Sequence, residues 1–169
     1  MQEIKMINWN DKAYVLKAVK ICGNNLYYAS KRLCDDEEIV LEAIKTSGLI
    51  LKYASPRLRN DRIVVLSTVK RYGWAVEFAS KRLRDDKEVM LTAIKQDSEA
   101  LKFASERLRD DEDVVREALK KDVYMMKYAS ERLQKDEDIL KDVPRYIFAH
   151  LQKSIFARTQ KERSKNEKA

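Results

Sequence analysis

The sequence repeats itself every 25 residues, and this period limits the available folds more than any other feature. An aromatic residue, an alanine and a serine recur as a triplet, with arginine and leucine two and three positions after the serine. The five serines are Ser30, Ser55, Ser80, Ser105 and Ser130. The chain therefore divides into units at 10–34, 35–59, 60–84, 85–109 and 110–134, followed by half a unit. A fixed period of this length is typical of stacked copies of one small structural unit.

Each unit is predicted to begin with a helix, near 36–46 in the second unit. Its apolar residues fall at i, i+1, i+4 and i+5 on one helix face, and they are Ile39, Val40, Ala43 and Ile44. An acidic run begins the unit, where Asp35 is the expected N-cap and Glu38 lies three residues later. Glycine, which is typical of a helix C-terminus, follows this helix at Gly23, Gly48 and Gly73. In the fourth and fifth units we expect Asp97 and Asp122 to be the N-caps of the next helix.

A second, shorter helix is predicted near 49–55, and a third helical turn at 56–59. Pro56 disfavours the α conformation at the preceding residue and suits the first position of a new turn. Ser55 is therefore the expected N-cap of the third turn. The leucines three positions after the serines are expected to be buried at the seam between units, and those of the central units are Leu58, Leu83 and Leu108.

The composition supports a helical protein and contains no pattern of a reaction site. Three glycines and two prolines in 169 residues are too few for most all-β folds. The two cysteines and the single histidine, His150, form no zinc-binding or nucleophile–base pattern. We therefore predict no catalytic residues, no metal and no cofactor, and a protein that is not an enzyme.

One such unit cannot bury its apolar face alone, but five stacked units form a continuous core. The predicted fold is all-α, an α-solenoid of five 25-residue helical repeats with a C-terminal capping helix. We assign the repeat domain to 1–143, an amphipathic helix to 144–159 and a disordered basic tail to 160–169. The amphipathic helix covers the last exposed core face or, in the alternative that stays open, binds a partner or a membrane surface.

The unit resembles a known repeat family. Residues 79–89, Ala-Ser-Lys-Arg-Leu-Arg-Asp-Asp-Lys-Glu-Val, are similar to the short helical repeat catalogued as domain of unknown function 4116, and the similarity spans 10–143. The resemblance implies a helical repeat found in intracellular bacteria, including proteins that resemble secreted effectors, and in some protists. It implies no activity and no catalytic residues. The sequence departs from the repeat at Pro56, at the two units without glycine and at Thr68, where other units have alanine.

Two rows of arginine run through the units. The arginine of every unit, from Arg32 to Arg132, has the chemistry to bind phosphate. Its presence in every unit favours a structural bond instead, to an N-cap aspartate or to backbone carbonyls at the junction. A second row is basic only in the central units, at Arg59, Arg84 and Arg109. Cys34 and Gln134 take its place at the ends, so we predict a local positive stripe for an acidic partner, with ordinary solvated arginines as the alternative.

Aromatic residues occupy positions that differ between units, where repeat proteins build their binding surfaces. Tryptophan, tyrosine and arginine are frequent at interaction hot spots. The candidate partner-binding residues are Leu49, Tyr72, Trp74, Tyr124, Arg59, Arg84 and Arg109. If Trp74 is an exposed anchor, Trp74→Ala abolishes partner capture with little change in stability. If it packs over the neighbouring unit instead, its loss lowers the free energy of unfolding by about 3–5 kcal/mol.

These patterns predict a non-enzymatic protein–protein interaction module, an adaptor, scaffold or inhibitor, that is a monomer or a homodimer. The alternative is electrostatic binding of nucleic acid or an anionic membrane, because residues 144–169 hold seven Lys and Arg against two Glu. The mixed charge of the repeats disfavours that alternative.

The expected location is the cytoplasm. No apolar leader or membrane-length segment is present, and two cysteines give no disulfide framework. If the protein is an effector, as the resemblance allows, we expect it to be delivered into a host cell.

Overall fold

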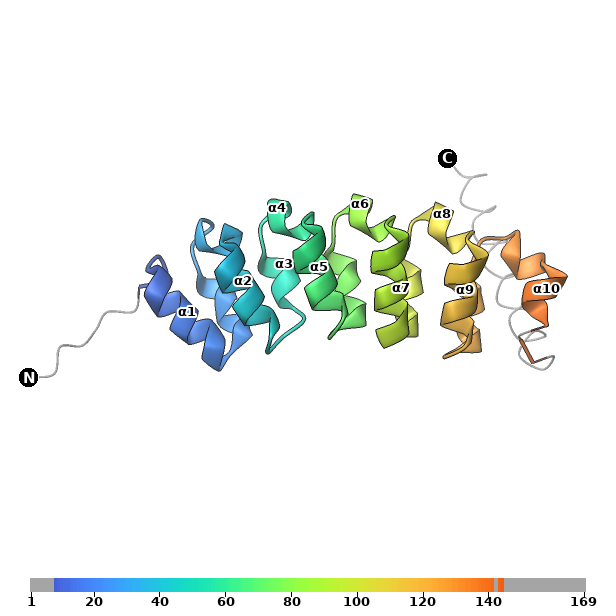
Figure 1. Cartoon of the computed structure of the whole chain (residues 1–169), viewed down its shortest axis with the longest axis horizontal. Helices are drawn as coiled ribbons and strands as arrows, with labels where there is room; N and C mark the ends of the chain where they lie inside the picture. Colours follow the sequence, from blue (N-terminus) through green and yellow to red (C-terminus); the bar gives the residue numbers. More distant parts are fainter. Residues whose placement is uncertain (1–7, 142, 145–169) are drawn as a thin grey trace, which may run out of the picture.

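The computed structural model describes residues 8–141, 143 and 144, and all regular structure within them is helical. These residues form a long stack of small helical units (Figure 1). The all-α solenoid of 25-residue repeats that the sequence predicts is therefore confirmed. The capping helix predicted at 144–159 and the tail predicted at 160–169 lie outside the described residues, except for the exposed Pro144.

One α-helix from each unit stands in a row along the stack (Figure 1). These first helices are α1 (Lys12–Ile21), α2 (Glu37–Ile44), α5 (Arg62–Val69), α7 (Lys87–Gln96) and α9 (Glu112–Leu119). The half unit adds α10 (Glu137–Leu140). Each first helix contacts the first helix of the next unit, so the row is continuous.

A second row of shorter helices packs against the first. These second helices are η1 (Gly23–Tyr28), α3 (Ile50–Tyr53), η3 (Gly73–Phe78), η4 (Ser98–Phe103) and η5 (Val123–Tyr128). Four of the five are 3₁₀-helices, a tighter form that proteins use in short pieces. The predicted second helix is confirmed as a short element, while its 3₁₀ geometry was not predicted.

Third turns connect each second helix to the next unit and lie along one edge of the stack (Figure 1). They are η2 (Leu33–Asp35), α4 (Pro56–Arg59), α6 (Lys81–Arg84), α8 (Glu106–Arg109) and η6 (Leu133–Lys135). Ser55 is the N-cap of α4, and its Oγ accepts from the amide of Leu58 at 3.2 Å. The helix boundary predicted from Pro56 is confirmed.

The N-caps of the first helices lie one residue later than the sequence suggested. They are Asp11, Asp36, Asp61, Asp86 and Asp111. The prediction of Asp35 as an N-cap is wrong, because Asp35 ends the preceding third turn while Asp36 accepts from the amide of Ile39 at 3.3 Å. Asp97 and Asp122 are confirmed as N-caps of second helices, each accepting from the amide two residues later at 3.0 and 2.9 Å.

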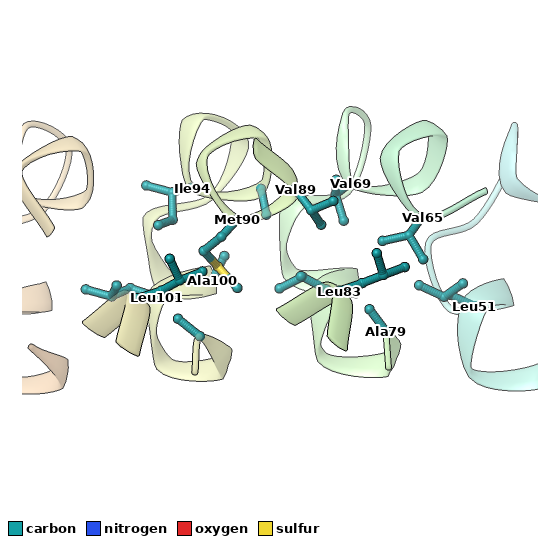
Figure 2. Packing of buried hydrophobic residues seen from close by; sticks show 14 of the residues in the cluster. Leu51, Val65, Val69, Ala79, Leu83, Val89, Met90, Ile94, Ala100 and Leu101 are labelled. Atoms are coloured by element: carbon teal, nitrogen blue, oxygen red, sulfur yellow. The ribbon is translucent and has the colours of Figure 1, made fainter. Parts of the chain in front are cut away.

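The core lies between the two rows and continues from unit to unit. Figure 2 shows apolar side chains of the first helices, such as Val65 and Val89, above those of the second helices and third turns, such as Leu101 and Leu83. The seam leucines are fully buried, as predicted, at Leu58, Leu83 and Leu108. Every unit therefore contributes apolar side chains at equivalent positions to one shared core.

The glycines allow neighbouring units to approach closely. None of the described glycines has a positive φ, so the left-handed cap conformation does not explain them. A Cβ atom on Gly73 would lie 2.4 Å from the carbonyl oxygen of Ala93, and one on Gly23 would lie 2.3 Å from that of Ala43. The backbone of one unit therefore lies directly against the first helix of the next.

Candidate protein-binding surface

The repeated triplet forms the junction between one third turn and the next. The Oγ of Ser55 donates to the carboxylate of Asp35, the last residue of η2. Arg57 donates from Nε to the same carboxylate at 2.9 Å and from Nη2 to the Asp35 carbonyl at 2.7 Å. We call this set of bonds the seam clamp.

The seam clamp recurs at every junction but the N-terminal one, where the Oγ of Ser30 has no hydrogen-bond partner among the described residues. With 3.0 Å between Nε and Oδ1 each time, the other pairs are Arg82 with Asn60, Arg107 with Asp85 and Arg132 with Asp110. At the N-terminal end, Arg32 donates to the carbonyl of Asn10 at 2.8 Å. The structural interpretation of this arginine row is confirmed, although the acceptor is the residue before the N-cap rather than the N-cap itself.

The seam clamp lowers the pKa of its aspartate carboxyl groups. The serine hydroxyl first, and then the arginine, hold the pKa of Asp35, Asp85 and Asp110 below the usual value. A carboxyl whose folded pKa is lowered stabilises the fold above its unfolded pKa. That stabilisation is lost as the pH falls through the folded pKa.

We therefore expect stability to fall in acid, below about pH 4, and to change little from there to neutrality on account of these groups. Asn60 already holds the same bonds in one clamp, with Ser80 donating to its Oδ1 at 2.6 Å. The variant with Asp35→Asn, Asp85→Asn and Asp110→Asn should lose less stability between neutral and acidic pH than the native chain. Urea denaturation at a series of pH values measures this. Equal acid sensitivity in both proteins would contradict a role for the clamp carboxylates.

The second arginine row differs from the seam clamp because the Nε donors of its arginines have no hydrogen-bond partner within residues 8–141, 143 and 144. Arg59, Arg84 and Arg109 are half-buried, and their Nε atoms are buried without a hydrogen bond. At the same position Gln134 donates to the carbonyls of Ala129 and Met126, at 2.9 and 3.2 Å. The position therefore binds the end of the second helix in that unit, whereas the three arginines leave their donors unused within the described part of the chain.

A hollow of about 270 Å³ lies between α6 and α8, beside two of these arginines. Its lining residues are Lys81, Arg84, Phe103, Ala104, Ser105, Glu106 and Arg109. Among the described residues, Lys81 also makes no ion pair or side-chain hydrogen bond. The hollow thus combines unpaired cations with the half-buried ring of Phe103.

The charges on the opposite row are more fully paired. A hollow of about 360 Å³ between α7 and α9 is lined by Lys87, Asp113, Glu117 and Lys120 among others. Lys87 pairs with Asp113 at 2.8 Å, and Lys120 pairs with Glu117 at 2.8 Å. The side formed by second helices and third turns is therefore the better candidate for a charged ligand.

The four apolar candidate residues are not equally exposed. Leu49 is 37% exposed and Tyr124 46%, whereas Tyr72 and Trp74 are half-buried. A Cβ on Gly48 would lie 2.6 Å from the Cβ of Tyr72 and 3.0 Å from the Trp74 ring. Trp74 therefore contacts the preceding unit while part of its surface remains accessible.

The structure links the aromatic positions to the arginine row through residues that the sequence analysis did not select. The Trp74 ring meets Phe78 edge to face with 6.2 Å between centroids, and the equivalent Phe103 lines the hollow with Arg84 and Arg109. We call Arg59, Arg84, Arg109, Lys81, Phe78 and Phe103 the arginine–aromatic row. The four-residue step from Trp74 to Phe78 would place both rings on one face of an α-helix, and the two rings also meet in the 3₁₀-helix η3.

No metal centre is present among the described residues, since no three His, Cys, Asp or Glu side chains are grouped to hold an ion. The only histidine of the sequence, His150, lies outside them. None of the described helices is long and apolar enough to cross a membrane. Cys22 is exposed and Cys34 half-buried, and both are free thiols.

Identical units, stacked through a shared core and joined by the same clamp, define an α-solenoid repeat protein. The family model described as a domain of unknown function, number 4116, matches residues 11–59, 36–84, 61–109, 86–134 and 111–143. The chain belongs to this family. Successive matches begin 25 residues apart and overlap, so one family domain covers about two structural units. Comparison with curated proteins and with solved structures found no match.

Proposed function

We propose that the protein is a non-enzymatic protein-binding module, and that its partner binds the side formed by the second helices and third turns. The arginine–aromatic row is the observation that carries this proposal. The guanidinium groups of Arg59, Arg84 and Arg109 bond no other described side chain, so a ligand carboxylate can bind them without displacing an existing contact. Unpaired arginine beside aromatic surface is also the composition of interaction hot spots.

The exposed side chains of Leu49 and Tyr124 also support binding on the side formed by the second helices and third turns. Both open a second helix, at the position that Trp74 occupies in η3. A repeat protein presents such differing residues in a line because each unit has the same geometry. We propose that these residues extend the contact beyond the arginine–aromatic row.

Binding of nucleic acid is the second candidate, supported by the arginine row alone. Acidic residues interrupt the positive charge, because Glu106 lines the hollow and Glu99 lies on the same second helix as Phe103. A nucleic-acid surface concentrates one sign of charge. An intracellular role, in the producing cell or in a host cell, belongs to the same proposal and is supported by the two free thiols.

Partner capture tests the proposed side of the stack. The full chain, immobilised, is incubated with lysate from its source organism, and the captured proteins are identified by mass spectrometry. We expect the double variant Leu49→Ala, Tyr124→Ala to capture at least about tenfold less of a specific partner, because truncating an interaction hot spot costs more than 1 kcal/mol. Its thermal midpoint should stay within about 3 °C of native because both side chains are exposed.

The matched control is the double variant Ile21→Ala, Ile63→Ala. It removes two apolar side chains that are 84% and 67% exposed, but from first helices. The control should capture the partner as well as the native chain does. Loss of capture in the control alone would assign binding to the row of first helices and contradict the proposal.

A further inference from the structure

We propose that the arginine–aromatic row binds an extended acidic segment of a partner protein, with carboxylate side chains on Arg59, Arg84 and Arg109. This inference rests on the proposed function and names the chemistry of the ligand. The ligand is a peptide, because the arginines are separate charges that recur once per unit. The side chains of an extended peptide also recur at regular intervals and can reach them one by one.

Carboxylate is the group that best completes these arginines. Guanidinium groups bind carboxylates through two parallel bonds, and these bonds are stronger than bonds between neutral groups. The seam clamp shows the same chemistry in the same molecule, where Arg107 holds the carboxylate of Asp85 with 3.0 Å between Nε and Oδ1. The seam arginines already hold the residue at their own junction through Nε and Nη2, whereas Arg84 and Arg109 bond no other described side chain and line the hollow.

The hollow between α6 and α8 indicates what accompanies the carboxylates. Its volume of about 270 Å³ lies over Phe103 and Ala104, between Arg84 and Arg109. An apolar side chain of the ligand placed there would contact the Phe103 ring while its acidic neighbours reach the two arginines. Lys81 adds a third unpaired cation to the lining, and Glu106 supplies the only negative charge on it.

The distribution of acids favours a peptide over a nucleic acid. Duplex DNA carries one negative charge per about 1.7 Å, and a protein that binds it needs a continuous cationic surface. Here each arginine of the row is one unit away from the next, and the carboxylates of Asp85 and Asp110 follow Arg84 and Arg109 directly. A peptide whose carboxylates are separated by uncharged residues can place them on the arginines and is repelled less by Asp85 and Asp110 than DNA is.

A binding titration with defined probes tests the inference. The probe is a fluorescein-labelled peptide in which glutamate alternates with glycine around one phenylalanine, long enough to pass three units when extended. A second peptide has glutamine in place of glutamate, and a third probe is single-stranded DNA of similar length. Fluorescence anisotropy with the full chain gives each dissociation constant at low and physiological salt.

The variants separate the effect of the arginine–aromatic row on binding from the effect of the protein's net charge. Arg84→Gln places the residue that the fifth unit has naturally at Gln134, so it is expected to fold, and circular dichroism verifies this. The triple variant replaces Arg59, Arg84 and Arg109 with glutamine. The charge-matched control replaces Lys45, Lys70 and Lys95 with glutamine, which removes three exposed cations from the same three units.

We expect Arg84→Gln to weaken binding of the acidic peptide about tenfold or more, and the triple variant to weaken it further. The lysine control should change it less than about threefold, because exposed charges contribute little. The glutamine peptide should not bind. Equal losses in the two triple variants, or binding of DNA but not of the acidic peptide, would overturn the inference. If the acidic peptide fails while partner capture still depends on Leu49 and Tyr124, the ligand chemistry is wrong and the proposed function stands.

Discussion

Leu83→Ala is expected to lower the free energy of unfolding by about 2–5 kcal/mol. Leu83 is fully buried at the seam, and Figure 2 shows it in the apolar layer with Ala79 and Val89. The loss combines the transfer free energy of the removed atoms with the cavity they leave, because neighbouring units can relax only partly. Chemical denaturation monitored by circular dichroism measures it.

The control for Leu83 is Ile63→Ala. Ile63 is 67% exposed on α5, so its truncation should change stability by less than about 0.5 kcal/mol. Leu58 and Leu108 are buried as completely as Leu83, and their truncation should have similar effects. A loss below about 1 kcal/mol for Leu83→Ala would mean that the seam is less tightly packed than this structure shows.

Gly73→Ala is expected to destabilise the protein by about 1–3 kcal/mol, although glycine has no special backbone role there. Its φ is not positive, so alanine fits the conformation and would by itself stabilise by about 0.4–1 kcal/mol through the unfolded state. The new Cβ would lie 2.4 Å from the Ala93 oxygen and 2.8 Å from the Asp97 nitrogen. Both are backbone atoms of the next unit, so relief requires the two units to separate.

The fourth unit provides the control for this prediction. Ser98 occupies the position of Gly73 and already has a Cβ, so Ser98→Ala should change stability by less than about 0.5 kcal/mol. Thermal and chemical denaturation of both variants separate the steric effect from the conformational one. A neutral or stabilising Gly73→Ala would show that the close approach is not a constraint on folding.

Most residues of the candidate surface could be predicted from the sequence. Which of them are buried and which contact one another could not. The arginine positions were found because they change at the ends of the array, where Cys34 and Gln134 replace them. The sequence could not show that Trp74 is half-buried over Gly48, nor that Phe103 joins Arg84 and Arg109 in one hollow. Those relations depend on how far each unit is turned and shifted against the next.

Most of the elements and their register could be predicted from local patterns in the sequence. Local rules of capping, backbone sterics and apolar periodicity act within a few residues, and they account for the serine caps, the boundary before Pro56 and the leucine three positions after each serine. These rules were sufficient for the third-turn boundary at Ser55 and the burial of Leu83.

The contacts between units could not be predicted from the sequence and are seen in the three-dimensional structure. The serine and arginine bonds of the seam clamp join residues 20 and 22 positions apart. Asp35 therefore accepts bonds from the next third turn instead of capping its own helix. The close contact of Gly73 with Ala93 and the unpaired donors of Arg84 have the same origin. The physical reason is that stacking geometry is set by the packing of whole units in a shared core, and no local pattern of residues specifies that geometry.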